Sequence, residues 1–304
     1  MSNMQNINNN WEDSLKQIAV QAGEIIMSFD RNDLSIERKR DNSQVTIADK
    51  AADEYICAQL RKLSGDIPII SEEGEQQAGA STFWCVDPLD GTKGYINGGN
   101  EFTVNIALVH DGLPVIGVIY IPPTDALYYG QMNYGQVAQD ENMANIAYRL
   151  IAGMKTKLQV RNPPAQGNRV ILSHYHDATK QAELAKQFNA YEFLTASSSL
   201  KFCRIAEGIA DIYPRFGNTM EWDTAAGHAI LKAAGGRVML MSDDDVGENN
   251  VNDCNTNINY DNASDYISLH NNMGNKYNSE LKYGKQGFLN PHFVAFGGDM
   301  TDII

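Results

Sequence analysis

The sequence has few of the residues that support small secreted proteins or zinc fingers. Only four cysteines occur in 304 residues and no two form a C-x-x-C pair; they are Cys57, Cys85, Cys203 and Cys254. Scattered cysteines argue against a zinc site or a disulfide framework and favour buried free thiols in a reducing compartment. The first ten residues lack the basic start and apolar run of a secretory signal, so we expect no export.

Long hydrophobic runs are also missing. The most apolar region, residues 102–121, is interrupted by polar and turn-forming residues, namely Asn105, His110, Asp111, Gly112 and Pro114. A membrane-spanning helix needs about 20 apolar residues in a row, whereas two short apolar runs joined by a turn are typical of paired β-strands. We therefore expect a cytoplasmic protein without a membrane span.

Positive charge is scarce, with 24 Lys and Arg against 38 Asp and Glu and a formal net charge of −14. This imbalance argues against non-specific nucleic-acid binding and against a polybasic membrane patch. Residues 243–280 contain eight acidic residues and one Lys, which account for half of the net charge. Because this segment is also rich in Asn and poor in aliphatic residues, we predict a flexible insertion over residues 242–281.

Hydrophobic residues make up 43% of the chain, enough for substantial cores. Apolar spacing predicts a helix over residues 11–29, and a second helix is expected from Thr46, with Asp49 in a capping-box position. Residues 31–42, between these helices, are charged and predicted to be irregular. Apolar runs predict strands at residues 67–70, 83–86, 102–108, 115–121 and 127–137. Residues 1–160 are thus predicted to form an α+β half with a mainly antiparallel sheet.

The composition changes near residues 159–167, where Pro and Gly indicate a boundary between two halves. Beyond it helical and strand patterns alternate, with strands at 169–173, 192–195, 210–213, 237–241 and 293–296 and helices at 179–188, 198–207 and 223–234. Such alternation is typical of an α/β layered domain, so residues 161–304 are predicted to form an α/β half.

Two carboxylates, Asp87 and Asp90, stand three residues apart just beyond the apolar run 83–86. A Pro and a Gly beside them allow a sharp turn, in which both carboxylates and the Leu89 carbonyl point the same way. Three hard oxygen donors suit Mg²⁺. The segment is therefore a candidate metal site.

Gly91 and Thr92 follow this candidate site directly. If the next segment is helical, their backbone N–H groups can bind a phosphate. Asp-Pro and Asp-Gly pairs are also common in plain surface turns, so the motif alone leaves both interpretations open.

Other acidic residues fall at predicted ends of helices and strands. Asp49 and Asp223 are explained equally well as helix caps, and Glu72 as a solvated residue after a strand. Together with Asp87 and Asp90 they could gather around hard cations, which is the functional alternative.

A second group of residues is basic or carries hydroxyls. Ser198 and Lys201 begin a predicted helix, and Arg215 ends the next strand. Hydroxyl, ammonium and guanidinium groups can bind a second phosphate, although a serine cap with two surface cations explains them as well. His174 and His176 follow a strand and have more often a structural role.

Three separated stretches resemble the signatures of the inositol monophosphatase superfamily of metal-dependent, lithium-sensitive phosphatases. They are Glu72-Glu73, Asp87-Pro-Leu-Asp-Gly-Thr92 and Trp222-Asp223-Thr-Ala-Ala-Gly. Further stretches are similar to the bisphosphate nucleotidases of that superfamily, namely Glu101–Leu108, Ser198–Cys203, Tyr213–Gly217 and Phe288–Pro291. The resemblance implies a layered αβαβα sandwich that hydrolyses 3'-phosphoadenosine 5'-phosphate to AMP and phosphate.

Carried over by motif position, the resemblance also implies the site residues. Two or three Mg²⁺ ions would be held by Glu72, Asp87, the Leu89 carbonyl, Asp90 and Asp223. The catalytic residues would be Glu72, Thr92 and Asp49. The substrate would be bound by Gly91, Thr92, Ser198, Lys201, Arg215 and Asp223.

The resemblance leaves alternatives. Gly94 replaces a Glu that is usual in such nucleotidases, which puts one contact near the substrate in doubt. An inositol-phosphate or sugar-phosphate phosphatase on the same fold is the nearest rival, and a catalytically silent nucleotide-binding protein is a rival of another class. We expect a monomer or homodimer that acts on a small molecule. Relatives are sometimes placed on the cytoplasmic face of the inner membrane, which this chain neither supports nor opposes.

Overall fold

The computed structural model describes residues 11–31, 34–38, 44–74, 76–133, 145–174, 178–241 and 279–298. The first half contains α1 (Trp11–Ser28), β1 (Ile36–Arg38), β2 (Gln44–Thr46), α2 (Ile47–Ser64), β3 (Ile69–Ser71), β4 (Thr82–Asp90), α3 (Thr92–Ile96), β5 (Thr103–His110), β6 (Leu113–Ile121), η2 (Pro122–Thr124), β7 (Ala126–Gln131), β8 (Ile146–Ile151) and β9 (Met154–Lys157). The second half contains β10 (Asn168–Leu172), α4 (Ala178–Gln187), β11 (Ala190–Thr195), α5 (Leu200–Ala206), β12 (Ile212–Arg215), η3 (Glu221–Asp223), α6 (Ala225–Ala233), β13 (Arg237–Leu240) and β14 (Phe293–Phe296).

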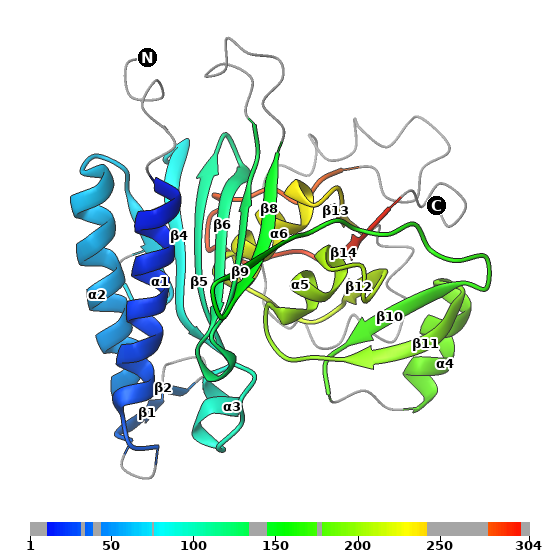
Figure 1. The fold of residues 1–304 in the computed structure, drawn as a ribbon, viewed down its shortest axis with the longest axis horizontal. Helices are drawn as coiled ribbons and strands as arrows, with labels where there is room; N and C mark the ends of the chain where they lie inside the picture. Colours follow the sequence, from blue (N-terminus) through cyan, green and yellow to red (C-terminus); the bar gives the residue numbers. More distant parts are fainter. Residues whose placement is uncertain are drawn as a thin grey trace.

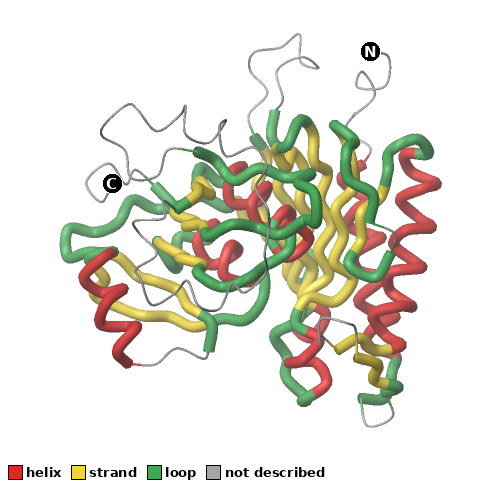
Figure 2. Tube along the Cα trace, turned by 180° about the vertical axis from the view of Figure 1, so that it is seen from behind, coloured by secondary structure: helices red, strands yellow, loops and turns green. Residues whose placement is uncertain are grey.

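These elements stack in five layers (Figure 1). Helices α1 and α2 cover one face of a seven-stranded sheet, and α5 and α6 cover its other face. A five-stranded sheet follows, and α4 packs on β11 at the outside. The αβαβα sandwich expected from the resemblance is therefore confirmed, and Figure 2 shows the same layers from behind.

The two sheets differ in whether neighbouring strands run parallel or antiparallel, as the sequence pattern predicts. In the larger sheet the order is β3-β4-β5-β6-β7-β8-β9, and every neighbouring pair except the parallel β3–β4 pair is antiparallel. In the smaller sheet the order is β11-β10-β12-β14-β13, with β10 parallel to both of its neighbours. Hairpins suit the first half, whereas crossover helices suit the second.

The layers are held together by three groups of buried apolar side chains. One lies between α1, α2 and the larger sheet, a second between that sheet and the α5–α6 layer, and a third between the smaller sheet and α4. Two glycines allow α6 to approach the larger sheet closely. A Cβ at Gly117 would lie 2.3 Å from the Ala226 carbonyl oxygen, and one at Gly130 would lie 2.4 Å from the Ile230 Cα. Since α6 follows Asp223, this close packing also places the segment that carries Asp223.

Several details differ from the sequence-based expectations. The segment predicted to be irregular contains β1, which pairs with β2 as a small antiparallel hairpin. Helix α6 begins at Ala225, because residues 221–223 form a 3₁₀ turn before it. The predicted insertion ends earlier than residue 281, since Glu280 bridges to Met239 and Leu281 is fully buried. Residues 134–137 of a predicted strand, His176, Cys254 and residues 242–278 lie outside the described residues.

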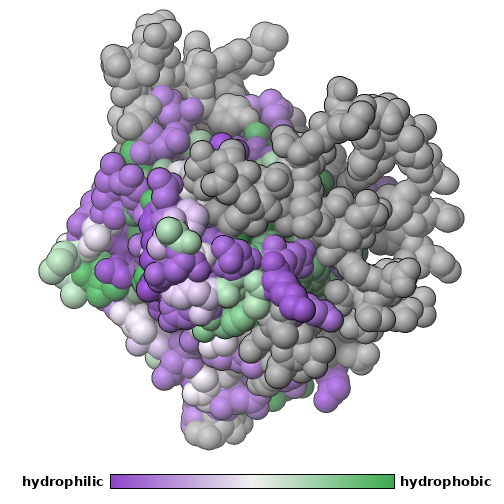
Figure 3. Space-filling view, turned by 90° about the vertical axis from the view of Figure 1, so that its right-hand side faces the viewer, coloured by the Kyte–Doolittle hydropathy of each residue, from purple (hydrophilic) through white to green (hydrophobic). Residues whose placement is uncertain are grey.

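The surface and the described helices fit the composition. No helix in the described ranges is long and apolar enough to cross a membrane. On the side where β10, β11 and α4 lie, the coloured surface is mostly hydrophilic (Figure 3). The described cysteines Cys57, Cys85 and Cys203 are buried free thiols, as expected.

Candidate active site

The acidic motif lies on a distorted end of β4. Strand β4 continues to Asp90, whereas the sequence pattern ended the strand at Val86. Asp87 is opposite Asn105 and Asp90 is opposite Thr103, so three steps along β4 match two along β5. In a regular strand, residues three apart point to opposite faces, but one extra residue in a bulge brings them to the same side. The bulge thus directs both carboxylates toward one site.

The Asp87–Asp90 turn is fixed by its own hydrogen bonds. The Leu89 N–H donates to Asp87 Oδ1 over 3.0 Å, and the Thr92 hydroxyl donates to the Leu89 carbonyl oxygen over 3.0 Å. Gly91 has a φ of 96° and precedes the short helix α3, which starts at Thr92. The segment after the motif is therefore helical, which was the condition for a phosphate site at Gly91 and Thr92.

Asp49 is the helix cap that the sequence offered, and it also contacts the acidic motif. Its Oδ2 accepts hydrogen bonds from the Thr46 N–H over 2.8 Å and from the Thr46 hydroxyl over 2.5 Å, which confirms the capping box at the start of α2. Its Oδ1 lies 3.0 Å from the Thr92 hydroxyl oxygen, whose one proton is shared between Asp49 and the Leu89 carbonyl oxygen. Asp49 therefore caps α2 and also reaches the motif on β4.

Asp223 comes to the same region from the second half of the chain. It ends the η3 turn, which packs against β4 and β5. Its Oδ2 accepts the Met220 N–H over 2.8 Å, so one carboxylate oxygen is held by its own turn. The predicted helix cap is thus a cap of the 3₁₀ turn that precedes α6.

Glu72 follows β3, beside the start of the motif. Its N–H donates to the Val86 carbonyl oxygen over 3.1 Å, which extends the β3–β4 pairing past Ser71. Behind it, the Ser71 hydroxyl donates to the Asp53 carboxylate on α2. Glu72 is therefore placed by the parallel strand pair and not by a free loop.

These five residues, Asp49, Glu72, Asp87, Asp90 and Asp223, are called the acidic cluster below. Burial raises the pKa of Asp87 well above its usual range, and the negative charges of the other four raise it further. Burial also raises the pKa of Asp223 to about 8, with the charges of Asp90 and Glu72 acting in the same direction. The carboxylates thus lie near enough to repel one another in a buried place.

The donor set of the acidic cluster fits a hard divalent cation. Carboxylate and carbonyl oxygens are the ligands that Mg²⁺ prefers, and a cation would offset the mutual repulsion of these carboxylates, of which Asp49 and Asp87 are buried. Within the described residues, no three Asp, Glu, His or Cys side chains are already arranged as ligands of one ion. The fit therefore rests on the chemistry and charge of the cluster.

Lys201 is a buried cation next to this cluster. It is 3% exposed, and its ammonium donates to the Ser198 carbonyl oxygen over 2.7 Å and lies 5.0 Å from the Tyr213 ring centre. Burial lowers the pKa of Lys201 to about 8. The negative charge of Asp90 raises this pKa, whereas the positive charge of Arg215 lowers it further. Lys201 therefore lies within electrostatic range of both an acid and a second cation.

Arg215 lies at the end of β12, where the sequence placed it. Its guanidinium donates to the carbonyl oxygens of Gly217 over 3.1 Å and Asn218 over 2.8 Å. These bonds hold the loop after β12 near the guanidinium, whose charge acts on the Lys201 ammonium. The structure thus brings together the two predicted phosphate-binding cations.

Ser198 and Gly91 meet between the acidic and basic groups. Ser198 has a φ of 53°, which is uncommon for a residue other than glycine, and its hydroxyl oxygen would lie 2.7 Å from a Cβ at Gly91. Backbone strain of this kind often marks a functional site. Any side chain at Gly91 would displace Ser198.

His174 and Glu101 were given little or no weight from sequence. His174 bonds to the Glu101 carboxylate over 2.8 Å, and the same carboxylate accepts the Ser197 N–H over 2.9 Å. Glu101 begins one of the stretches that are similar to the bisphosphate nucleotidases, but no role was assigned to it from sequence. A side chain at Gly94 would begin 3.9 Å from the Glu101 carbonyl oxygen, on an exposed part of α3.

Sequence reasoning missed the buried polar residues Thr103 and Asn105 on β5. Both are at most 1% exposed, and Asn105 donates to Asp90. The available signal was their spacing of two in an otherwise apolar strand, which puts both side chains on one face.

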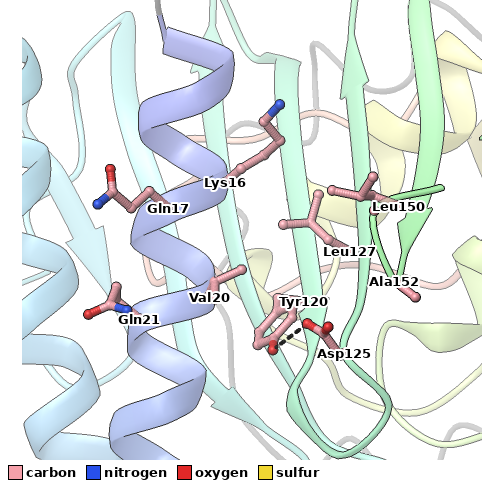
Figure 4. A pocket seen from close by; sticks show the side chains of 10 residues that line it. Lys16, Gln17, Val20, Gln21, Tyr120, Asp125, Leu127, Leu150 and Ala152 are labelled. Atoms are coloured by element: carbon pink, nitrogen blue, oxygen red, sulfur yellow. Dashed lines mark hydrogen bonds between the residues drawn. The ribbon is translucent and has the colours of Figure 1, made fainter. Parts of the chain in front are cut away.

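A separate hollow of about 240 Å³ lies between α1 and the larger sheet (Figure 4). Its lining includes Lys16, Gln17 and Leu150, and Tyr120 donates to Asp125 over 3.0 Å at one end. None of its lining residues belongs to the acidic cluster or to the basic pair Lys201 and Arg215. It therefore has no part in the candidate active site.

The αβαβα sandwich and the acidic motif at Asp87–Thr92 together indicate the class of protein to which the chain belongs. The Inositol monophosphatase family matches residues 8–272. The chain belongs to this family.

Curated relatives and a solved structure narrow the comparison. The chain is 42% identical over 230 residues to 3'(2'),5'-bisphosphate nucleotidase CysQ of Salmonella typhimurium, which covers 73% of this chain and 87% of that protein. It is 40% identical over 234 residues to CysQ of Escherichia coli, covering 74% of this chain and 89% of that protein. The structure of CysQ from Bacteroides thetaiotaomicron matches with a TM-score of 0.66 and 32% identity, over 95% of this chain and 98% of that one.

Proposed function

We propose that the protein is a Mg²⁺-dependent 3'(2'),5'-bisphosphate nucleotidase that hydrolyses 3'-phosphoadenosine 5'-phosphate to AMP and phosphate. Three features support the proposal: the similarity to CysQ proteins, the acidic cluster, and the basic pair. The observation that carries it is the position of Lys201, which is buried and within electrostatic range of both Asp90 and Arg215.

Two separate charged regions suit a substrate with two phosphates. The acidic cluster would hold Mg²⁺ through Glu72, Asp87, Asp90, Asp223 and the Leu89 carbonyl. The basic pair would bind the phosphate that is not cleaved, because an ammonium and a guanidinium favour a dianion. A substrate with a single phosphate would leave the position for a second phosphate beside Lys201 and Arg215 empty.

The chain's own residues have distinct roles in this proposal. When bound, Mg²⁺ supplies the activation of water and the neutralisation of phosphate charge. The Thr92 hydroxyl, held by Asp49 over 3.0 Å, would orient the attacking water together with Glu72. The backbone N–H groups of Gly91 and Thr92 would bind the scissile phosphate, and Ser198 would contact the nucleotide at the strained turn beside Gly91.

The proposal predicts a substrate preference. Phosphate release should be measured side by side from 3'-phosphoadenosine 5'-phosphate and from inositol 1-phosphate, with Mg²⁺, with EDTA and with added Li⁺. We expect Mg²⁺-dependent, Li⁺-sensitive turnover that favours the nucleotide. A preference for inositol 1-phosphate would contradict the substrate assignment, and no turnover of either would favour a silent nucleotide-binding protein.

The location and assembly expected from the sequence stay predictions. They are a place in the cytoplasm, with or without contact with the inner membrane, and a monomeric or dimeric state.

A further inference from the structure

A buried polar network lies behind Asp90, at the place where the two halves of the chain meet. Thr103 and Asn105 come from β5, and Ser199 precedes α5 in the second half. All three are at most 1% exposed. The Thr103 and Ser199 hydroxyls each lie 2.9 Å from Asn105 Oδ1 and 2.9 Å from each other.

An ionised Asp90 carboxylate allows only one orientation of the Asn105 amide. With Oδ1 toward the two hydroxyls, one hydroxyl donates to Oδ1 and the other donates either to Oδ1 or to the first hydroxyl, and the NH₂ group faces Asp90 Oδ2 over 3.3 Å. With the amide turned over, its oxygen would face the carboxylate oxygen of Asp90, and two acceptors would meet without a proton between them. The ionised Asp90 carboxylate therefore determines that Asn105 donates to it, and the Thr103 and Ser199 hydroxyls hold the amide oxygen on the other side.

This orientation has a consequence for Asp90. Its Oδ2 accepts two N–H donors, the Asn105 amide and the Ser199 backbone N–H, the latter over 2.9 Å. A carboxylate that is held by two donors at one oxygen cannot rotate freely, so its other oxygen also has a fixed position. One of these donors comes from β5 and the other from the second half of the chain.

We propose that Asn105 is a positioning residue for the metal site, held in place by Thr103 and Ser199 so that it fixes the Asp90 carboxylate for Mg²⁺. The inference rests on the proposed function, because it needs Asp90 to bind the metal. Groups that orient a metal ligand in this way commonly change metal affinity by about 10-fold to 100-fold when they are removed.

The test measures binding of Mg²⁺ alone to metal-free protein by calorimetry. Asn105→Ala should weaken Mg²⁺ binding by about 10-fold. Thr103→Val removes one hydroxyl at nearly constant volume and should weaken binding by a smaller factor. Because Thr103 acts through Asn105, the double variant should bind no more weakly than Asn105→Ala alone. Steady-state kinetics should show the same defect, as a higher Mg²⁺ concentration for half-maximal rate with less change of kcat at saturating Mg²⁺.

Asn168→Ala is the matched control. Asn168 is also a 1% exposed asparagine, and its amide donates to the Phe188 carbonyl oxygen over 2.7 Å, but it lies at the start of β10 in the other sheet. It should lose stability without loss of Mg²⁺ affinity. Equal affinity of wild type and Asn105→Ala, or an equal loss in Asn168→Ala, would overturn the inference.

A further variant separates the inference from the proposed function on which it rests. If Asp90→Asn binds Mg²⁺ as tightly as wild type, the metal assignment and the positioning role both fail. If Asp90→Asn loses binding while Asn105→Ala retains it, only the positioning role fails. Should Asn105→Ala not fold, the affinity of Thr103→Val decides in the same way.

Discussion

The Thr92 hydroxyl donates to Asp49 Oδ1 over 3.0 Å, which joins two residues that are 43 positions apart. Asp49 is in the first turn of α2 and Thr92 is the first residue of α3, so the bond links two helix starts across the end of β4. The same Asp49 carboxylate is already fixed by Thr46. Thr92 is thus oriented by a group that is itself held in place.

The first prediction concerns this bond. Thr92→Val keeps the shape of the side chain but removes the hydroxyl, so phosphate release should fall by about 100-fold, a common effect of losing one group that orients or deprotonates water. The circular dichroism spectrum should be unchanged. Thr124→Val, at an exposed residue of η2, is the control and should keep full activity. Unchanged turnover in Thr92→Val would remove Thr92 from the catalytic residues.

The second prediction concerns Asp90. Asp90→Asn is nearly isosteric but supplies a weaker metal ligand, so we expect most of the activity to be lost with little loss of fold. Phosphate release at saturating Mg²⁺ and the midpoint of thermal unfolding test this. Asp111→Asn is a suitable control, since Asp111 has a φ of 47° that Asn also tolerates. Normal turnover of a well-folded Asp90→Asn protein would refute the metal assignment.

The third prediction concerns substrate choice. Lys201→Met removes the buried charge at similar volume and should raise the KM for 3'-phosphoadenosine 5'-phosphate by at least about 10-fold, the effect of losing one charge-assisted contact. The KM for inositol 1-phosphate should change much less. Lys186→Met, on the exposed side of α4, is the control for loss of a lysine charge. Equal effects on both substrates would show that Lys201 does not select the second phosphate.

The fourth prediction concerns stability and pH. Glu280 accepts hydrogen bonds from His228 and Lys232; burial raises its pKa, but these bonds outweigh burial and lower it to about 2. Burial lowers the pKa of His228. Both shifts mean that the unfolded chain binds more protons, so stability falls as the pH falls. The His228 contribution is lost below about 6.5, and that of Glu280 between about 4.5 and 2.

Denaturant unfolding of wild type and Glu280→Gln at several pH values measures this effect. At pH 7 the variant should be less stable by about 2 kcal/mol, after allowance for partial exposure of the pair. The difference in unfolding free energy should shrink steadily below pH 4.5. In that range the unfolded chain binds a proton at Glu280 more readily than the folded protein does. A difference that does not depend on pH would show that the ion pair is not its source.

The fifth prediction concerns the contact between α6 and the larger sheet. Gly130→Ala places a methyl group 2.4 Å from the Ile230 Cα and should cost about 1 to 3 kcal/mol of unfolding free energy, as overpacking does. Gly94→Ala is the control, because its Cβ would lie no closer than 3.9 Å to the Glu101 carbonyl oxygen. Thermal unfolding should therefore separate the two variants. Equal midpoints would show that α6 can shift without cost.

Much of the fold could be predicted from the sequence because its signals are local. The spacing of apolar residues located α1 and most strands, and the Thr46 and Asp49 pair located the start of α2. The sequence pattern failed to predict elements whose position depends on packing with distant parts of the chain. Strand β9 is exposed along its whole length and has no apolar alternation, so it depends on its pairing with β8. Leu281 was assigned to a polar segment although its side chain is fully buried.

The sequence predicted the acidic and basic residues of the candidate site, but it did not predict the residues that hold them in place. Motif order identified Asp87, Asp90 and Asp223, because each motif is contiguous. No pattern in the sequence indicated that Asn105 donates to Asp90, since the two residues meet only through the pairing of β4 with β5. Long-range hydrogen bonds of this kind are set by strand register.

The sequence by itself determined which residues carry charge, where helices and strands begin, and that two charged groups occur at their ends, because these depend on spacing along the chain. Only the tertiary structure decided how those ends meet. The bulge in β4 turns Asp87 and Asp90 to one side, and the approach of the second half brings Ser199 to Asp90 over 2.9 Å. Sheet register and layer packing fix these distances, and both are properties of contacts between residues far apart in the chain.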